Sequence, residues 1–121
     1  RIHLTKEDVI KIHNEMIRLF GGSKGILSEG TIDYLVYKAA AGGDPLTEAA
    51  TLLTTIAQEH PFMDGNKRTA FVAANAILGL NGLELGVEEN ELAEFVFKVA
   101  QGKLDSKGVA DWLRNRVKRM R

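Results

Sequence analysis

The stretch of sequence that decides this fold lies at residues 60–70 and reads His60-Pro61-Phe62-Met63-Asp64-Gly65-Asn66-Lys67-Arg68-Thr69-Ala70. An apolar run, Phe71–Leu80, follows directly and predicts a buried helix. Backbone N–H groups point outward at the N-terminus of a helix, and the helix dipole favours negative charge there. A charged turn that leads into a buried helix is therefore a place where phosphates can be held.

His60 and Asp64 are the candidates for proton transfer and metal binding. A neutral histidine can accept a proton from a hydroxyl, because the unperturbed pKa of this side chain lies near ~6.5, so His60 is a candidate general base. Asp64 offers hard oxygen ligands suited to a Mg²⁺ ion that also contacts phosphate oxygens. Plainer interpretations exist: a histidine before proline is often a structural loop residue, and Asp64 before a glycine suits a turn or a helix cap.

The next four residues are the candidates for phosphate binding. Gly65 permits a backbone conformation closed to other residues and has no side chain to block a ligand. Asn66 can donate hydrogen bonds from its side chain and from its backbone. Lys67 and Arg68 add positive charge, and the arginine can contact two phosphate oxygens at once. Basic residues in a first helical turn oppose the helix dipole unless an anion is bound, which favours a binding function.

The same stretch resembles the signature of the Fic/Doc family, and more closely that of its Doc branch. The Fic pattern is His-Pro-Phe-x-Asp/Glu-Gly-Asn-Gly-Arg, usually with a second arginine three residues later. This chain has Lys67 in place of the second glycine and Phe71 in place of the second arginine, and Asn-Lys-Arg-Thr-Ala is the Doc form. The resemblance extends over nearly the whole chain, from Gly21-Gly22 to Trp112-Leu113.

The resemblance implies a nucleotide-dependent transferase. Fic enzymes transfer AMP from ATP to a hydroxyl of a target protein, whereas Doc toxins transfer the terminal phosphate from a nucleotide held the other way round. Lys67 crowds the approach of the inner phosphates and Phe71 removes a phosphate clamp, so both departures favour phosphorylation. The roles that follow are a catalytic base at His60, a Mg²⁺ ligand at Asp64, and ATP binding by Gly65, Asn66, Lys67 and Arg68.

The family also implies partners. The expected target is a Ser or Thr hydroxyl on a translation factor, with elongation factor Tu as the family precedent, so that translation is blocked. A small antitoxin with a disordered tail that folds into a groove on the toxin is the second expected partner. AMP transfer of the Fic type is the alternative reaction. The non-enzymatic alternatives are a helical binding module and a nucleic-acid binder that uses the basic residues between Arg114 and Arg121.

The composition is compatible with one domain over residues 1–121. The chain has 121 residues, of which 45% are hydrophobic, enough to bury one core. Its formal net charge is zero, so no overall field attracts it to nucleic acid or membrane, and neither partner is expected. Without cysteine the chain has no disulfide or thiol chemistry, and a reducing compartment is permitted. With no visible signal peptide and no apolar run that could span a bilayer, we expect a cytoplasmic protein.

Hydrophobic periodicity predicts an all-α fold with the motif helix buried at the centre of a bundle. The expected helices are residues 6–20, one capped by Ser28, 46–59, the motif helix to Asn81, 89–100, and one capped by Ser106 that includes Val117. Residues 83–85 give a slight strand signal. The break at Gly42–Pro45 is either an ordinary loop or the flap on which Fic-like proteins hold a target segment as an added strand. His3 and His13 lack metal-ligand spacing with His60, so we interpret them as surface or core residues.

Overall fold

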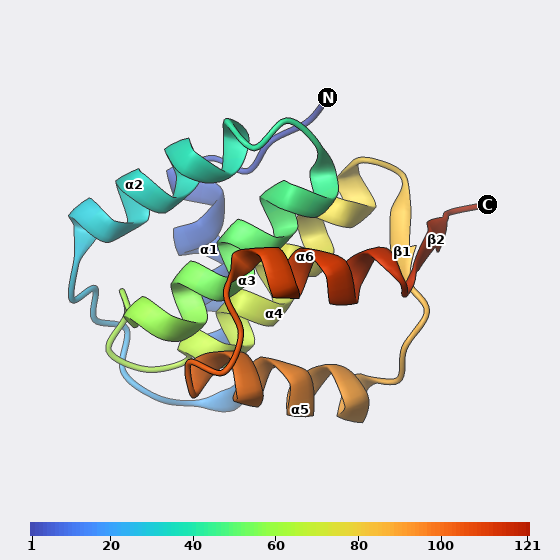
Figure 1. The fold of residues 1–121 in the computed structure, drawn as a ribbon. Helices are drawn as coiled ribbons and strands as arrows, with labels where there is room; N and C mark the ends of the chain where they lie inside the picture. Colours follow the sequence, from blue (N-terminus) through green and yellow to red (C-terminus); the bar gives the residue numbers. More distant parts are fainter.

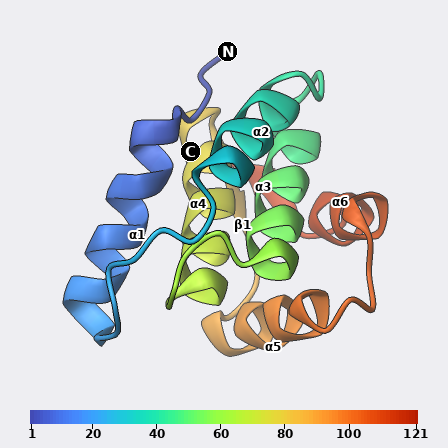
Figure 2. The ribbon, with the colours of Figure 1, turned by 90° about the vertical axis from the view of Figure 1, so that its left-hand side faces the viewer.

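The computed structural model describes all residues 1–121 as a bundle of six helices with one small sheet (Figures 1 and 2). The helices are α1 (Lys6–Phe20), α2 (Glu29–Ala40), α3 (Pro45–Glu59), α4 (Asn66–Leu80), α5 (Glu89–Ala100) and α6 (Ser106–Arg114). Strands β1 (Leu83–Leu85) and β2 (Val117–Arg119) pair in antiparallel orientation. The predicted all-α fold is confirmed. None of the six helices combines the length and the apolar character that a membrane span requires.

Helices α3 and α4 form the centre of the bundle (Figure 2). Helix α3 packs against α2, α4, α5 and α6, while α4 packs against α1, α3 and α5. Both central helices carry fully buried alanines, whose small side chains let neighbouring backbones approach closely. These alanines are Ala49, Ala50, Ala57, Ala70, Ala73 and Ala74. The prediction that the motif helix, α4, is buried is therefore confirmed.

Side-chain caps satisfy free backbone N–H groups at the beginning of four of the six helices. The capping residues are Thr5 for α1, Ser28 for α2, Asp44 for α3 and Asp105 for α6. Helices α4 and α5 have no such cap. Helix α5 has acidic residues in its first turn, Glu89 and Glu91, whereas α4 has none. The N-terminus of α4 is therefore the end in this bundle that leaves both its N–H groups and its dipole uncompensated.

Two of the predicted boundaries are wrong at the C-terminal end of the chain. Helix α6 is capped by Asp105, one residue before the predicted Ser106, and it ends at Arg114. Val117 consequently lies in β2, opposite Leu85 of β1, instead of in the helix. Pairing with β1 still packs Val117 against the core, so an apolar residue at helical spacing is partly buried by a strand.

The turn between α2 and α3 lies far from the predicted catalytic residue. This turn precedes the 15-residue helix α3, and His60 follows that helix, so about 22 Å of helix separates them. Figure 1 shows this turn and the segment that follows α3 at opposite ends of that helix. The flap interpretation of Gly42–Pro45 is therefore wrong. His3 lies at the same end as the turn, where its Nδ1 is 2.8 Å from the buried carboxylate of Glu48, and its interpretation as a surface residue is confirmed.

The close packing of α4 predicts opposite effects for two enlargements of the same helix. Ala73 is fully buried, so Ala73→Leu should lower the free energy of unfolding by about 1–3 kcal/mol through overpacking. A Cβ added at Gly79 meets nothing within 4 Å, so Gly79→Ala should raise it by roughly 0.5–1 kcal/mol. Urea unfolding of both variants measures the difference. If Ala73→Leu were as stable as the unmodified chain, the packing around Ala73 would have room for a larger side chain and would not be close.

Candidate functional site

The motif loop, residues 60–65, connects the C-terminus of α3 to the N-terminus of α4. His60 is the C-cap of α3 and has a left-handed backbone, with φ 51° and ψ 60°. It is the one non-glycine residue in the chain with positive φ, and its side chain is exposed. Such a conformation costs on the order of 1–3 kcal/mol and persists only where the surroundings fix it. The structure therefore holds the predicted base at an exposed and strained position.

Two residues of the motif close the loop on itself. The Asn66 side chain accepts a hydrogen bond from the Phe62 N–H at 3.0 Å and donates one to the Phe62 carbonyl at 2.8 Å. Phe62 is fully buried, so its ring anchors the loop in the core. Because the Asn66 amide is used inside the loop, the backbone N–H is the group of Asn66 that stays available to a phosphate.

The segment between α1 and α2, residues 21–28, covers one side of the motif loop. The Leu27 and Ser28 N–H groups both donate to the Pro61 carbonyl, at 2.8 and 3.1 Å, and the Met63 N–H donates to the Gly25 carbonyl at 2.8 Å. These bonds form a short antiparallel bridge next to the site. Sequence reasoning missed this contact, because the residues involved are separated by more than 30 positions.

Asp64 makes two contacts that fix it in place. Its Oδ2 accepts a hydrogen bond from the Ser23 N–H at 2.8 Å, and its carbonyl lies 2.7 Å from Nε2 of His13. The side chain does not cap α4, whose N-cap is Gly65, so the capping interpretation is wrong. No group of three or more His, Cys, Asp or Glu residues is placed to hold a metal ion. Asp64 therefore fits Mg²⁺ only as one ligand among substrate phosphates and water, which is the usual manner of Mg²⁺ binding.

His13 is a site residue whose role sequence reasoning missed. It is fully buried in α1, and its ring stacks on Phe62 with centroids 3.8 Å apart and planes within 6°. A carbonyl can only accept a hydrogen bond, so Nε2 carries the hydrogen in its contact with Asp64. Nδ1 is buried without a partner. The core interpretation of His13 is confirmed, and a polar residue on an apolar helix face was the available signal that it needs a partner.

The N-terminus of α4 presents the groups that the sequence predicts for phosphate binding. Gly65 has φ 76°, and a Cβ on it would lie 3.2 Å from Cδ1 of Ile17, so this position requires glycine. The first helical bond runs from the Thr69 N–H to the Gly65 carbonyl, at 2.9 Å. The N–H groups of residues 66–68 therefore have no partner within the helix, and two of these residues, Lys67 and Arg68, are exposed cations.

A cleft of about 730 Å³ lies beside this turn, between α1, α4 and α5, and we name it the α4 cleft. Its lining includes the four predicted phosphate-binding residues at positions 65–68. The Arg68 guanidinium lies 4.2 Å from the ring centroid of Phe20, which is 57% exposed. Phe71 and Phe97 add apolar surface to the same lining. The cleft can therefore accept a molecule with an anionic part and a flat apolar part, as a nucleotide has.

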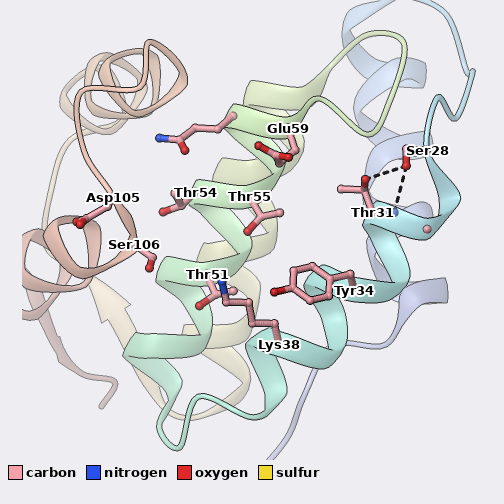
Figure 3. A pocket seen from close by; sticks show the side chains of 12 residues that line it. Ser28, Thr31, Tyr34, Lys38, Thr51, Thr54, Thr55, Glu59, Asp105 and Ser106 are labelled. Atoms are coloured by element: carbon pink, nitrogen blue, oxygen red, sulfur yellow. Dashed lines mark hydrogen bonds between the residues drawn. The ribbon is translucent and has the colours of Figure 1, made fainter.

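A second cleft, of about 610 Å³, lies between α2, α3 and the beginning of α6 (Figure 3). Hydroxyl groups dominate its lining, and Tyr34 is its one hydrophobic residue, so we name it the hydroxyl groove. Glu59, which directly precedes His60, and Ser28, which bonds to Pro61, both belong to this lining. The two clefts share no lining residue, and both include residues that contact or adjoin the motif loop.

The chain is similar to proteins of one known family. The model of the Fic/DOC family matches residues 3–78, which include α1, α2, α3, the motif loop and most of α4. The chain is 31% identical over 118 residues to the protein kinase doc of Escherichia phage P1, covering 93% of each chain. It is 34% identical over 93 residues to a toxin Doc of Mycolicibacterium smegmatis, covering 71% of this chain and 69% of that protein.

Two substitutions separate the packing of His13 from its hydrogen bond. His13→Ala removes both, and should lower the free energy of unfolding by about 2–4 kcal/mol because it leaves a cavity beneath Phe62. His13→Phe keeps a ring against Phe62 and removes only the bond to Asp64, so it should cost about 1–2 kcal/mol. Urea unfolding measures both effects, and amide chemical shifts report the motif loop. Unchanged stability and unchanged loop shifts in His13→Phe would show that this bond does not hold the loop.

Proposed function

The chain belongs to the Fic/DOC family, in its Doc branch, and we propose that it is a toxin that transfers the γ-phosphate of ATP to a Ser or Thr hydroxyl of a target protein. The observation that carries this proposal is the uncapped N-terminus of α4, where free N–H groups meet Lys67 and Arg68. Such an end binds phosphate without further help. A candidate base, His60, stands at the other end of the same short loop.

Each site residue has a role in the proposed reaction. His60 takes the proton of the acceptor hydroxyl, whose oxygen bonds to the γ-phosphorus while the bond from that phosphorus to the β–γ bridging oxygen breaks and ADP leaves. The N–H groups of Gly65–Arg68 and the two cations stabilise the phosphate charge. Bound Mg²⁺, with Asp64 as its protein ligand, would neutralise further phosphate charge. Because phosphoryl transfer depends mainly on position and charge, a rigid loop is well suited to it.

Two positions favour phosphorylation over AMP transfer. Lys67 is exposed in the first turn of α4, where a glycine would leave the backbone open to the inner phosphates. Phe71 lines the α4 cleft where a second arginine would clamp phosphate. The phage P1 relative is named a protein kinase, which supports the same choice. AMP transfer remains the alternative that the labelling experiment below distinguishes.

The proposed partners follow from the same relatives. A toxin of this branch acts with an antitoxin, and we expect one whose disordered tail folds on this chain. Elongation factor Tu, the target by family precedent, would place the activity in the cytoplasm and explain a block of translation. The structure gives little support to a nucleic-acid binder, because three of the five basic residues between Arg114 and Arg121 are paired with carboxylates. These pairs are Arg114–Asp111, Arg116–Glu91 and Lys118–Glu84.

The nature of the transferred group is tested with ATP labelled separately at the α- or γ-phosphate and purified elongation factor Tu. We expect the γ label alone to reach the target protein. His60→Ala should lower the rate by roughly 10²- to 10⁴-fold, the usual range for a positioned base, while nucleotide affinity stays unchanged. Transfer of the α label would establish AMP transfer instead. Near-normal turnover of His60→Ala would show that another group is the base.

The metal role of Asp64 is tested with Asp64→Asn, which keeps an oxygen to accept from the Ser23 N–H and removes the charge. The half-saturating Mg²⁺ concentration should rise roughly tenfold or more, which corresponds to about 1.4 kcal/mol of lost affinity. Asp64→Ala, which removes the Ser23 contact as well, should also lower the stability of the loop by about 1 kcal/mol. Unchanged Mg²⁺ dependence in both variants would make Asp64 a purely structural residue.

A further inference from the structure

We propose that the hydroxyl groove binds the target polypeptide on one side of the Ser or Thr that receives the phosphate. This inference rests on the proposed function, because a phosphoryl transfer between ATP and a protein needs a second substrate site. The residues that carry it are three threonines of α3 that line the groove, Thr51, Thr54 and Thr55.

The floor of the groove is a stripe of uncharged polar side chains on one face of α3. Thr51, Thr54, Thr55 and Gln58 follow the spacing i, i+3, i+4 and i+7, which places them on the same side of a helix. Threonine is a poor helix former, so this stripe is not explained by the stability of α3. A hydroxyl can both donate and accept, so such a stripe matches the alternating N–H and C=O groups of a peptide backbone.

One hydroxyl in the stripe is left without a partner. Thr54 is 7% exposed, and its Oγ1 makes no hydrogen bond within the chain. Figure 3 shows Thr54 directed from α3 toward Asp105 and Ser106, across the groove. A buried hydroxyl without a partner is unfavourable, so this position is one where a bound polar chain would supply what the fold does not.

The charge and the small apolar content of the groove lining favour a polypeptide over other ligands. The charged residues in the lining are Lys38, Glu59 and Asp105, so carboxylates outnumber cations. A nucleic-acid backbone would meet net negative charge there. Tyr34 is the one hydrophobic residue of the lining, which gives too little apolar surface for a lipid or a flat cofactor. A neutral chain with many donors and acceptors fits this lining best.

The groove also borders the motif loop that holds His60. Its lining ends at Glu59, next to His60, and at Ser28, which donates to the Pro61 carbonyl of the motif loop. None of its residues belongs to the α4 cleft, so both substrates can be bound together. From Thr51 to Glu59 the part of the lining that α3 supplies spans about 12 Å of helix, which is the length of about four extended residues. The groove therefore accommodates about four residues beside the phosphorylated one.

The test uses the triple variant Thr51→Val, Thr54→Val and Thr55→Val in the full chain. Valine keeps the branched shape of threonine and removes only the hydroxyl. The KM for the protein acceptor, with purified elongation factor Tu as the first one used, should rise at least tenfold. The kcat, the affinity for ATP and the melting temperature should not fall. Thr47→Val, the same substitution on α3 outside the groove, is the matched control and should leave the KM for the acceptor unchanged.

The outcomes separate this inference from the function on which it rests. An unmodified chain that transfers label to no protein would overturn both. If the unmodified chain labels its target normally and the triple variant has an unchanged KM for the acceptor, only the proposal for the hydroxyl groove would be overturned. A triple variant that loses affinity for a co-expressed antitoxin but keeps its acceptor KM would reassign the groove to the antitoxin and also overturn the proposal.

Discussion

The double hydrogen bond between the Asn66 side chain and the Phe62 backbone is the interaction on which the site depends. It lies in a buried position, where a lost bond would leave both backbone groups of Phe62 without partners. By closing the turn between α3 and α4, it fixes two things at once: the strained backbone of His60 and the direction of the free N–H groups that begin α4. His13 supports the same turn from below, through the Phe62 ring and the Asp64 carbonyl.

The N-terminus of α4 differs from those of the other five helices, each of which has either a side-chain cap or acidic residues in its first turn. Four other helices begin with a side-chain cap, each of which contributes about 1 kcal/mol. Helix α4 has no cap and carries two cations in its first turn, where they oppose the dipole. Residues that destabilise one helix end, in a protein whose other helix ends are stabilised, are characteristic of functional sites. A bound phosphate reverses the sign of both effects, because it accepts from the N–H groups and pairs with the cations.

Sequence reasoning predicted what local patterns determine. The ranges of α1 and α5, the cap of α2 at Ser28 and the burial of α4 all follow from periodicity and side-chain chemistry within a few residues. The missed features depend on contacts between distant positions: His13 and Asp64 are 51 residues apart, and Ser23 and Asp64 are 41 apart. The misplaced flap has the same origin, since a glycine-rich break shows that the chain turns but not what lies beside it. Val117 was misplaced because an apolar residue can be buried by a strand or by a helix, and its partner β1 lies more than 30 residues earlier.

The motif loop also determines how the two clefts relate to each other. Both are bordered by residues that contact or adjoin this loop, yet their linings have no residue in common. The groups that would bind nucleotide come from α1, α4 and α5, whereas the hydroxyl groove is built on α2, α3 and the beginning of α6. Substitutions in the groove can therefore alter which polypeptide is bound without moving the phosphate-binding turn. The loop itself has no such freedom, because His60, Asp64 and the first turn of α4 are fixed by the same few buried contacts, and any change in these contacts would act on all three together.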